Sequence, residues 1–185
     1  SGVRRITFDR PEVMNAFTGE TAAEFADALA GTDPADHDAV VVTGEGEAFS
    51  AGGDIQAMKD RIDGDAGPVE SYDRLEATFG RIVEEAFGLE VPIVAKVNGD
   101  AVGAGLAVAA LCDFAYAVES ANFSCAFVRV GLVPDAGGSF LLPHLVGLRT
   151  AKRLAFTGEF VDATEAAEIG LINEAVPAEE LDDTV

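Results

Sequence analysis

Hydrophobic residues follow two spacings along the chain, one typical of buried strands and the other of helices with one apolar face. Short apolar or β-branched runs predict strands at 4–9, 39–43, 91–97, 113–118, 121–125 and 173–176. Apolar residues three and four positions apart, or long runs of small apolar residues, predict helices at 18–30, 68–89, 101–112, 140–146, 149–156 and 164–169. The charged segment 61–67 is predicted as a loop. Because strands alternate with helices throughout, the pattern predicts an α/β fold.

Residues 98–113 form the most distinctive stretch, in which an Asn-Gly turn is followed by small apolar residues up to Cys112. With the β-branched run before it, this pattern predicts a buried strand that leads into a buried helix. Gly103 and Gly105 allow the first helical turn to approach another group closely, and its unpaired N–H groups favour negative charge. We interpret this turn as half of an oxyanion site. Tight packing of a core helix explains the two glycines equally well.

A second glycine turn lies in residues 48–55, where a short apolar run leads to Gly52, Gly53 and Asp54. A glycine pair followed by an acidic residue is typical of a strand end that turns into a helix, and such a bend presents backbone N–H groups. This turn is a second candidate donor for an anionic oxygen. A glycine-rich connection capped by Asp54 is the alternative, and the sequence does not choose between the two.

The charge balance is strongly acidic, with 33 Asp and Glu residues against 12 Lys and Arg and a net charge of −21. Such a surface repels nucleic acid and anionic membranes, so we expect neither as a partner. Acidic residues are spread over the whole length while 49% of residues are hydrophobic, which indicates a salt-adapted surface around a core. We expect a single cytoplasmic domain, because 185 residues fit one domain and no apolar run is long enough for a membrane span or a signal peptide.

The sequence argues against metal and nucleotide chemistry. The two cysteines, Cys112 and Cys125, lack a Cys-x-x-Cys spacing, and we expect them to be reduced core residues. Only two histidines are present, so we expect no metal site and no histidine-based triad. No dinucleotide, phosphate-loop or Gly-x-Ser-x-Gly fingerprint is complete.

Five blocks of residues span nearly the whole chain: 10–17 (Arg-Pro-Glu-Val-Met-Asn-Ala-Phe), 49–55 (Phe-Ser-Ala-Gly-Gly-Asp-Ile), 98–105 with 112–113, 131–138 (Gly-Leu-Val-Pro-Asp-Ala-Gly-Gly), and 157–158 with 170–172. In this order they resemble the crotonase (enoyl-CoA hydratase/isomerase) superfamily. The resemblance implies a spiral of ββα units, a homotrimer or a dimer of trimers, and acyl-CoA thioester substrates. Coenzyme A would then be part of the substrate, with no separate cofactor.

The resemblance also implies site residues. The thioester carbonyl would lie between the backbone N–H groups of Gly53 and Ala104, which would hold the oxygen of an enolate. These two donors would also contact the substrate, together with Met14, Ala16, Ala51, Asp54, Ile55, Gln56 and Phe127.

Departures from the family pattern narrow the chemistry. The two glutamates that act in the family's hydratases match Ala107 and Phe127, and neither side chain can move a proton. The remaining acidic candidate is Asp135, which resembles the aspartate in Pro-Asp-x-Gly-Gly of the family's ring and double-bond isomerases, including those of phenylacetate degradation. Among apolar neighbours such as Val133 and Phe140, it would have a raised pKa and shuttle a proton between C4 and C2 of a 3-enoyl thioester. On turn chemistry alone, a helix N-cap explains Asp135 at least as well.

Three functions follow from these residues. The first is an enoyl-CoA isomerase with Asp135 as the sole acid and base, the second is an enoyl-CoA hydratase, and the third is a non-catalytic protein that binds acyl-CoA thioesters. Family members continue for several helices after the region that matches 177–185. We therefore expect residues 1–185 to be a core domain, with the C-terminal helical trimerisation region largely absent.

Overall fold

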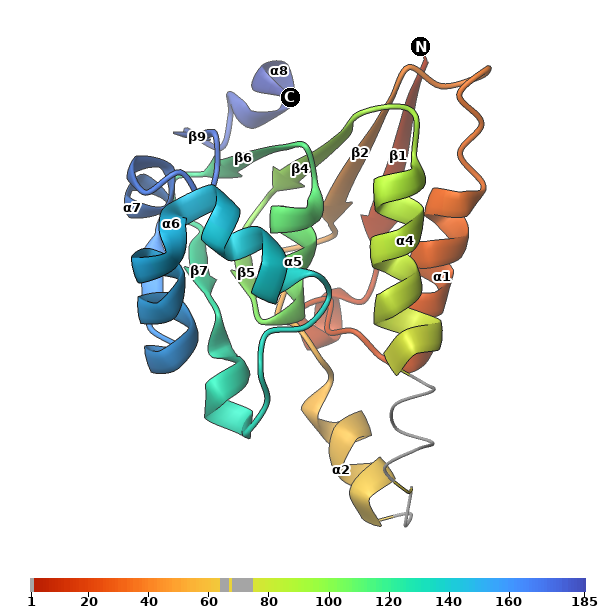
Figure 1. Cartoon of the computed structure of the whole chain (residues 1–185). Helices are drawn as coiled ribbons and strands as arrows, with labels where there is room; N and C mark the ends of the chain where they lie inside the picture. Colours follow the sequence, from red (N-terminus) through yellow and green to blue (C-terminus); the bar gives the residue numbers. More distant parts are fainter. Residues whose placement is uncertain (1, 64–66, 68–74) are drawn as a thin grey trace.

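The computed structural model describes residues 2–63, 67 and 75–185, and its strands form two sheets (Figure 1). The larger sheet has five strands, all parallel to their neighbours, in the order β1 (Val3–Phe8), β2 (Ala39–Gly44), β4 (Ile93–Val97), β6 (Phe114–Val118) and β9 (Glu174–Val176). The smaller sheet has four, in the order β3 (Ala48–Ser50), β5 (Asp100–Val102), β7 (Asn122–Ser124) and β8 (Phe160–Asp162). In the smaller sheet, only the β7–β8 pair is antiparallel.

Two strands followed by a helix form the repeating unit of the fold. In each unit the first strand joins the larger sheet and the second joins the smaller one. The units are β2–β3 with α2 (Ile55–Asp63), β4–β5 with α5 (Ala104–Leu111), and β6–β7 with α6 (Gly138–Thr157). This repeat confirms the expected α/β fold built from ββα units.

The remaining helices lie at the edges of this arrangement. Helices α1 (Gly19–Ala30) and α4 (Arg81–Gly88) run side by side (Figure 1), and an ion pair of 2.6 Å joins Arg81 to Asp27. Near the C-terminus lie α7 (Ala163–Glu168) and α8 (Leu181–Thr184). The described residues also form three short turns: the 3-10 turns η1 (Pro11–Val13) and η3 (Ala126–Val130), and the π-helical turn η2 (Glu76–Gly80).

Helix α5 lies at the centre of the core. Its residues from Ala104 to Ala110 are all buried, which fits a helix that is apolar on every side. Fully buried side chains of the same core come from both sheets, including Val97 in β4 of the larger sheet and Phe49 in β3 of the smaller one. The first turn of α5 is therefore fixed by packing on all sides.

Several predicted elements have different bounds in the structure. The helix predicted at 101–112 begins only at Ala104, because Ala101 and Val102 pair with β7 as strand β5. Small apolar residues suit both structures, so the pattern could not separate them. Helix α2 extends to Asp63, so the predicted loop at 61–67 is wrong at its first three residues. Residues 64–66 of that loop lie outside the described residues.

Two other predicted helices are changed in detail. Of the helix predicted at 68–89, residues 68–74 lie outside the described residues, and the rest forms η2 and α4. The helices predicted at 140–146 and 149–156 form the two halves of α6, separated by Gly147, which has a non-helical backbone (φ 76°, ψ 154°). Strand β8 was not predicted, because three residues are too few to show a period.

Gly105 gives a direct test of the packing around α5. A Cβ atom at this position would overlap the Ser50 carbonyl oxygen and lie 2.8 Å from the Ser50 Cβ. We expect Gly105→Ala to lower the free energy of unfolding by about 1–3 kcal/mol, because a close-packed core has no room for the added methyl group. Gly19→Ala is the control, since nothing lies within 4 Å of a Cβ there. Urea denaturation measures both, and equal stability of the two variants would contradict the packing argument.

Candidate active site

The two glycine turns predicted as anion sites meet in the structure. Gly52 has a left-handed backbone (φ +87°), and a Cβ atom on it would lie 2.5 Å from the Val102 carbonyl oxygen and 3.2 Å from the Ala104 nitrogen. The turn after β3 therefore packs directly against the start of α5, backbone against backbone. Glycine at position 52 permits this approach, because a side chain would push the two segments apart.

Gly53 and Ala104 each present a backbone N–H group near this contact. In the parallel bridge between Gly53 and Phe17, the Phe17 N–H donates to the Gly52 oxygen (2.6 Å) and the Asp54 N–H donates to the Phe17 oxygen (2.8 Å). This bridge leaves the N–H of Gly53 itself unused. Ala104 is the first residue of α5, so its N–H has no acceptor within the helix. In the part of the chain that the structure describes, neither N–H group has a hydrogen-bond acceptor.

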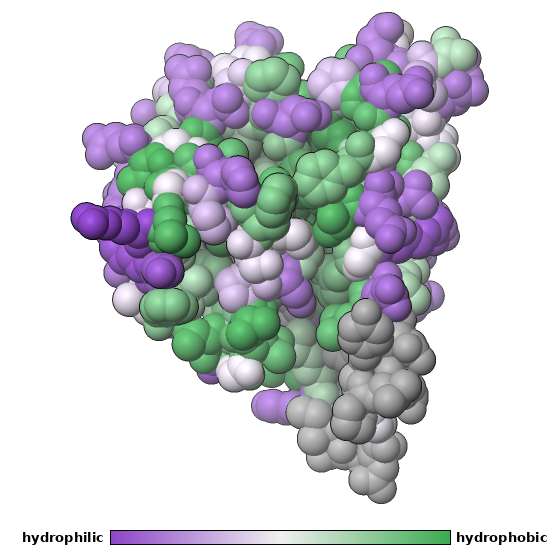
Figure 2. Space-filling model, viewed as in Figure 1, coloured by the Kyte–Doolittle hydropathy of each residue, from purple (hydrophilic) through white to green (hydrophobic). Residues whose placement is uncertain are grey.

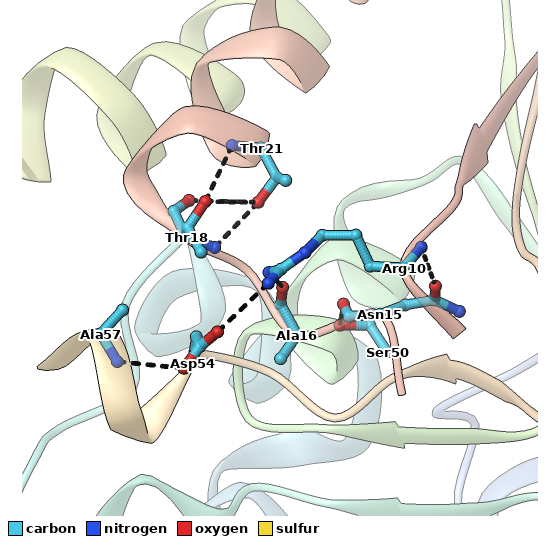
Figure 3. Close-up of polar contacts among 8 residues, drawn as sticks. All are labelled: Arg10, Asn15, Ala16, Thr18, Thr21, Ser50, Asp54 and Ala57. Carbon is cyan, nitrogen blue, oxygen red and sulfur yellow. Dashed lines mark hydrogen bonds and ion pairs between the residues drawn. The ribbon is translucent and has the colours of Figure 1, made fainter. Parts of the chain in front are cut away.

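Buried polar side chains hold the glycine turn from the other side (Figure 3). Asn15 has a left-handed backbone (φ 56°), and its side-chain amide donates to the carbonyl oxygens of Glu45 (2.9 Å) and Ala48 (2.8 Å). The Ser50 hydroxyl donates to the Asn15 carbonyl oxygen (2.8 Å) and accepts the Gly52 N–H (3.1 Å). These bonds fix the turn to the segment that precedes α1.

Asp135 lies in the loop between η3 and α6, where the structure excludes the helix-cap explanation. The N-cap of α6 is Gly137, and the Gly138 N–H bonds to the backbone oxygen of Asp135 (2.7 Å) and not to its carboxyl group. The Oδ1 atom of Asp135 is buried and, among the described residues, has no hydrogen-bond partner. Most buried polar atoms in proteins are bonded, so this oxygen calls for a functional explanation.

The surroundings of Asp135 favour its neutral form. Burial raises the pKa of Asp135 to about 6. Burial and the negative charge of Asp135 together raise the pKa of Cys125 to about 11, so the thiol stays protonated near neutral pH. Cys125 directly follows Ser124, the last residue of β7, whose carbonyl oxygen accepts the Gly103 N–H (2.8 Å). The charge of Asp135 therefore acts at the strand end that is bonded to the start of α5.

The Asp135 loop packs on α5, the helix whose first residue carries the Ala104 N–H. A Cβ atom at Gly138 would lie 3.6 Å from the Ala107 Cβ, so the turn that follows Asp135 packs on α5. Ala107 lies three residues after Ala104, which is about 4.5 Å along the helix axis. The Asp135 loop and the Ala104 N–H are therefore both near the N-terminal end of α5.

The residues expected to contact coenzyme A fall into two groups. Met14, Ala16 and Ala51 lie beside the glycine turn, and the Ala51 N–H donates to the Met14 carbonyl oxygen (2.8 Å). Ile55 and Gln56 lie on α2, which projects from the rest of the molecule in Figure 1. Met14, Ala16 and Ala51 therefore lie at the candidate site, whereas Ile55 and Gln56 lie on a helix that extends away from it.

Asp54 and Phe127, the other two residues expected to contact the substrate, have structural roles as a helix cap and a core side chain. Asp54 precedes α2, and its Oδ1 accepts the Ala57 N–H (3.0 Å), so its interpretation as a helix cap is confirmed. This bond, with help from Arg10, holds the pKa of Asp54 below its usual value. Phe127 lies in η3, only 6% exposed, and its ring belongs to the hydrophobic core.

Sequence reasoning did not find the role of Arg10, which it treated only as part of a strand break and a motif. The Nη1 atom of Arg10 donates to the Ala16 carbonyl oxygen (2.7 Å), and its Nη2 lies 3.5 Å from the Asp54 Oδ2. Arg10 and Asp54 are 44 residues apart in sequence. No local pattern connects such a pair, so only the three-dimensional structure shows it.

Across the described ranges, no set of three His, Cys, Asp or Glu side chains is arranged to hold a metal ion. Both cysteines are free. None of the described helices combines the length and apolar character that crossing a bilayer requires.

The fold and the site define a class of α/β protein that has two sheets and a wholly buried apolar helix. Near the start of that helix lie N–H groups without a partner in the described structure and one half-buried carboxyl group. The chain belongs to the enoyl-CoA hydratase/isomerase family, whose model matches residues 1–185.

Similar proteins carry several different activities in their names. The chain is 38% identical to crotonyl-CoA hydratase of Syntrophomonas wolfei (94% of this chain, 65% of the relative) and 36% identical to 1,2-epoxyphenylacetyl-CoA isomerase of Escherichia coli (99% and 70%). It is 37% identical to 4-chlorobenzoyl coenzyme A dehalogenase-1 of an Arthrobacter species (93% and 62%). A solved enoyl-CoA hydratase from Polaromonas has a TM-score of 0.90 at 30% identity, covering 99% of this chain and 70% of that one. The chain thus spans about two thirds of the length of its relatives.

The raised pKa of Asp135 predicts a pH-dependent effect of Asp135→Asn on stability. Asp135 ionises near pH 4 in the unfolded chain and near pH 6 in the folded one, so its burial costs stability as the pH rises through this interval. We expect Asp135→Asn to be more stable than the wild type at pH 8, by about 1–2 kcal/mol, and to gain much less at pH 4. Urea denaturation at both pH values measures this. A gain that is equal at pH 4 and pH 8 would show that the carboxylate is not destabilised by burial.

Proposed function

We propose that this protein is an enzyme that isomerises an enoyl-CoA thioester by moving a double bond, or rearranging a ring, through an enolate. The observation that most supports this function is the Asp135 carboxyl group. It is half-buried, its buried Oδ1 has no partner among the described residues, and its pKa is raised to about 6. A carboxyl group of this kind can both accept and donate a proton near neutral pH.

The proton follows a closed path in the proposed reaction. The Asp135 carboxylate takes a proton from C2 of a 3-enoyl thioester, and the electron pair moves onto the thioester oxygen to give a dienolate. The N–H groups of Gly53 and Ala104 hold this oxygen, and such a donor contributes about 3 kcal/mol in comparable acyl-transfer sites. Asp135 then returns the proton to C4, which gives the 2-enoyl thioester. No water is consumed.

Hydration of a 2-enoyl thioester is the second candidate, because several relatives are named hydratases, crotonyl-CoA hydratase among them. Adding water requires a group that activates it. The positions that resemble the hydratase glutamates carry Ala107 and Phe127, which are both buried and apolar. This observation places isomerisation ahead of hydration. Binding of an acyl-CoA thioester without reaction is the third candidate.

The proposed substrate contacts and assembly follow from the same family. Met14, Ala16, Ala51, Gly53, Asp54, Ile55, Gln56, Ala104 and Phe127 would line the coenzyme A arm and the acyl group. An aromatic acyl group, as in phenylacetate degradation, suits the same chemistry. The proposed location is the cytoplasm, and the proposed assembly is a homotrimer or a dimer of trimers. Figure 2 shows apolar surface over η3 and α6. Support for the assembly comes from large apolar side chains exposed on η3, α6 and the loop between them. They include Val128, Val130, Leu132, Val133, Phe140 and Leu148.

We further propose that the acidic surface is adapted to high salt. A net charge of −21 on 185 residues makes the folded chain repel itself, and salt screens this repulsion. We expect the melting temperature to rise by several degrees between about 0.1 M and 2 M KCl, as measured by calorimetry. Sucrose at equal osmolality is the control for effects that do not depend on charge. A melting temperature that falls or stays constant in KCl would contradict salt adaptation.

A paired assay tests the proposed reaction. In high salt, we expect a 3-enoyl-CoA to gain the absorbance of a conjugated enoyl thioester in the presence of the wild type. Asp135→Asn should lower this rate at least about 100-fold, because it removes the only proposed proton carrier. Asp183→Asn, on the exposed surface of α8, is the matched control and should keep the wild-type rate. Loss of absorbance from a 2-enoyl-CoA would instead establish a hydratase, and thioester binding without reaction would establish the third candidate.

A further inference from the structure

The segment that precedes α1, residues 10–17, is tied to the turn that carries Gly53. Backbone hydrogen bonds join Phe17 to Gly52 and to Asp54, one on each side of Gly53. Because both neighbours of Gly53 are held in this way, the direction of the Gly53 N–H depends on where Phe17 lies. A shift of residues 10–17 relative to the turn would rotate the Gly53 N–H away from the proposed position of the substrate oxygen.

Arg10 joins the two flanks of this bridge (Figure 3). Its Nη1 donates to the carbonyl oxygen of Ala16, the residue before Phe17, at 2.7 Å. Its Nη2 lies 3.5 Å from the Oδ2 of Asp54, the residue after Gly53. A single rigid guanidinium group therefore spans the contact between residues 10–17 and the donor turn.

Besides joining Ala16 to Asp54, Arg10 brings a positive charge close to the Asp54 carboxylate, next to Gly53. Asp54 carries a carboxylate one residue away from the Gly53 N–H, where the proposed reaction develops negative charge on the substrate oxygen. The side chains of Arg10 and Asp54 are only 30% and 16% exposed, so water screens their charges in part. The guanidinium group therefore offsets the repulsion between Asp54 and an oxyanion held by Gly53.

We propose that Arg10 is a positioning residue for the Gly53 N–H, which it aligns by joining Ala16 to Asp54 and protects from the Asp54 charge. The proposal rests on the function proposed above. Alignment and charge both matter most when the substrate oxygen becomes negative, so Arg10 acts on the transition state more than on the neutral thioester. Loss of its side chain should therefore lower kcat more than it raises KM.

The Arg10 side chain can be removed without dismantling the turn. The backbone N–H of Arg10 donates to the Asn15 Oδ1 (2.9 Å), and a substitution leaves this bond in place. Asn15 and Ser50 still hold the turn through their own hydrogen bonds. A partly exposed ion pair such as Arg10–Asp54 contributes little to stability. A structural role alone would thus leave kcat close to the wild-type value.

The kinetic test compares Arg10→Met with a matched control. We expect Arg10→Met to lower kcat for a 3-enoyl-CoA by about 10-fold to 100-fold, with KM changed less than about threefold, and Arg10→Lys to recover part of the loss. Arg153→Met is the control, because the Arg153 guanidinium also bonds two partners, the carboxylates of Glu159 and Glu165, on an exposed surface. Its kcat should equal the wild-type value. An unchanged kcat in Arg10→Met, or an equal fall in both variants, would overturn the proposal.

A double variant tests the charge effect. Asn caps helices as well as Asp does, so Asp54→Asn removes the charge and keeps the cap of α2. We expect the Arg10→Met, Asp54→Asn protein to regain at least about threefold in kcat over Arg10→Met alone, because position 54, next to the Gly53 donor, then carries no negative charge. A double variant no faster than Arg10→Met would overturn the charge effect.

A spectroscopic measurement separates this inference from the proposed reaction. Acetoacetyl-CoA forms an enolate that absorbs in the ultraviolet, and N–H groups aligned on its oxygen favour this form without any contribution from Asp135. At saturating ligand we expect a strong enolate band with the wild type and with Asp135→Asn, and a weaker band with Arg10→Met. Equal bands in the wild type and Arg10→Met would overturn the proposal, whether or not isomerisation occurs. Failure of the wild type to bind acetoacetyl-CoA would contradict the proposed function itself.

Discussion

The candidate site depends on one steric constraint, the contact between the main chain of the turn after β3 and the main chain at the start of α5. A Cβ atom at Gly52 or Gly105 would overlap backbone atoms of the opposing segment, so the two segments approach more closely than any pair with side chains there. The turn belongs to one ββα unit and α5 to the next. The N–H groups of Gly53 and Ala104 thus lie close together because the two successive ββα units pack backbone against backbone at Gly52 and Gly105.

Hydrogen bonding divides the polar groups of the site into two kinds. Asn15 and Ser50 are buried and bonded to several backbone groups, and they hold the turn in one geometry. Within the described structure, the N–H groups of Gly53 and Ala104 and the Oδ1 of Asp135 have no partner. Free polar groups inside a well-bonded frame cost stability, and proteins keep them where a ligand can satisfy them. The candidate site is therefore identified by unbonded polar groups next to fully bonded ones, which neither the burial of residues nor the net charge of the chain would reveal.

Much of the fold was predictable from sequence, because its helices and strands are amphipathic or uniformly apolar over several residues. The break at Gly147 in α6 was also visible, whereas β8 is too short and β5 too similar to the start of a buried helix. The glycine turns could be found, but not their contact, which joins segments about 50 residues apart. For Asp135, a helix cap and a partly buried carboxyl group fit the same sequence pattern, and only the backbone of the loop decides between them. Arg10 could not be found at all, because its partner is remote in sequence.

The bridge between Phe17 and Gly53 has a consequence for how this site can change during evolution. Every bond that aims the Gly53 N–H in that bridge comes from the backbone, and the donor itself is a backbone group. Side-chain substitution cannot remove either donor, because both are main-chain groups, and Arg10, Asn15 and Ser50 are the side chains that hold the turn in place. Under the proposed function, a lineage can therefore alter which acyl group is accepted and still keep the N–H groups that would hold the acyl oxygen. Main-chain donors that stay the same while the surrounding side chains change would explain why relatives in this family have names with different activities.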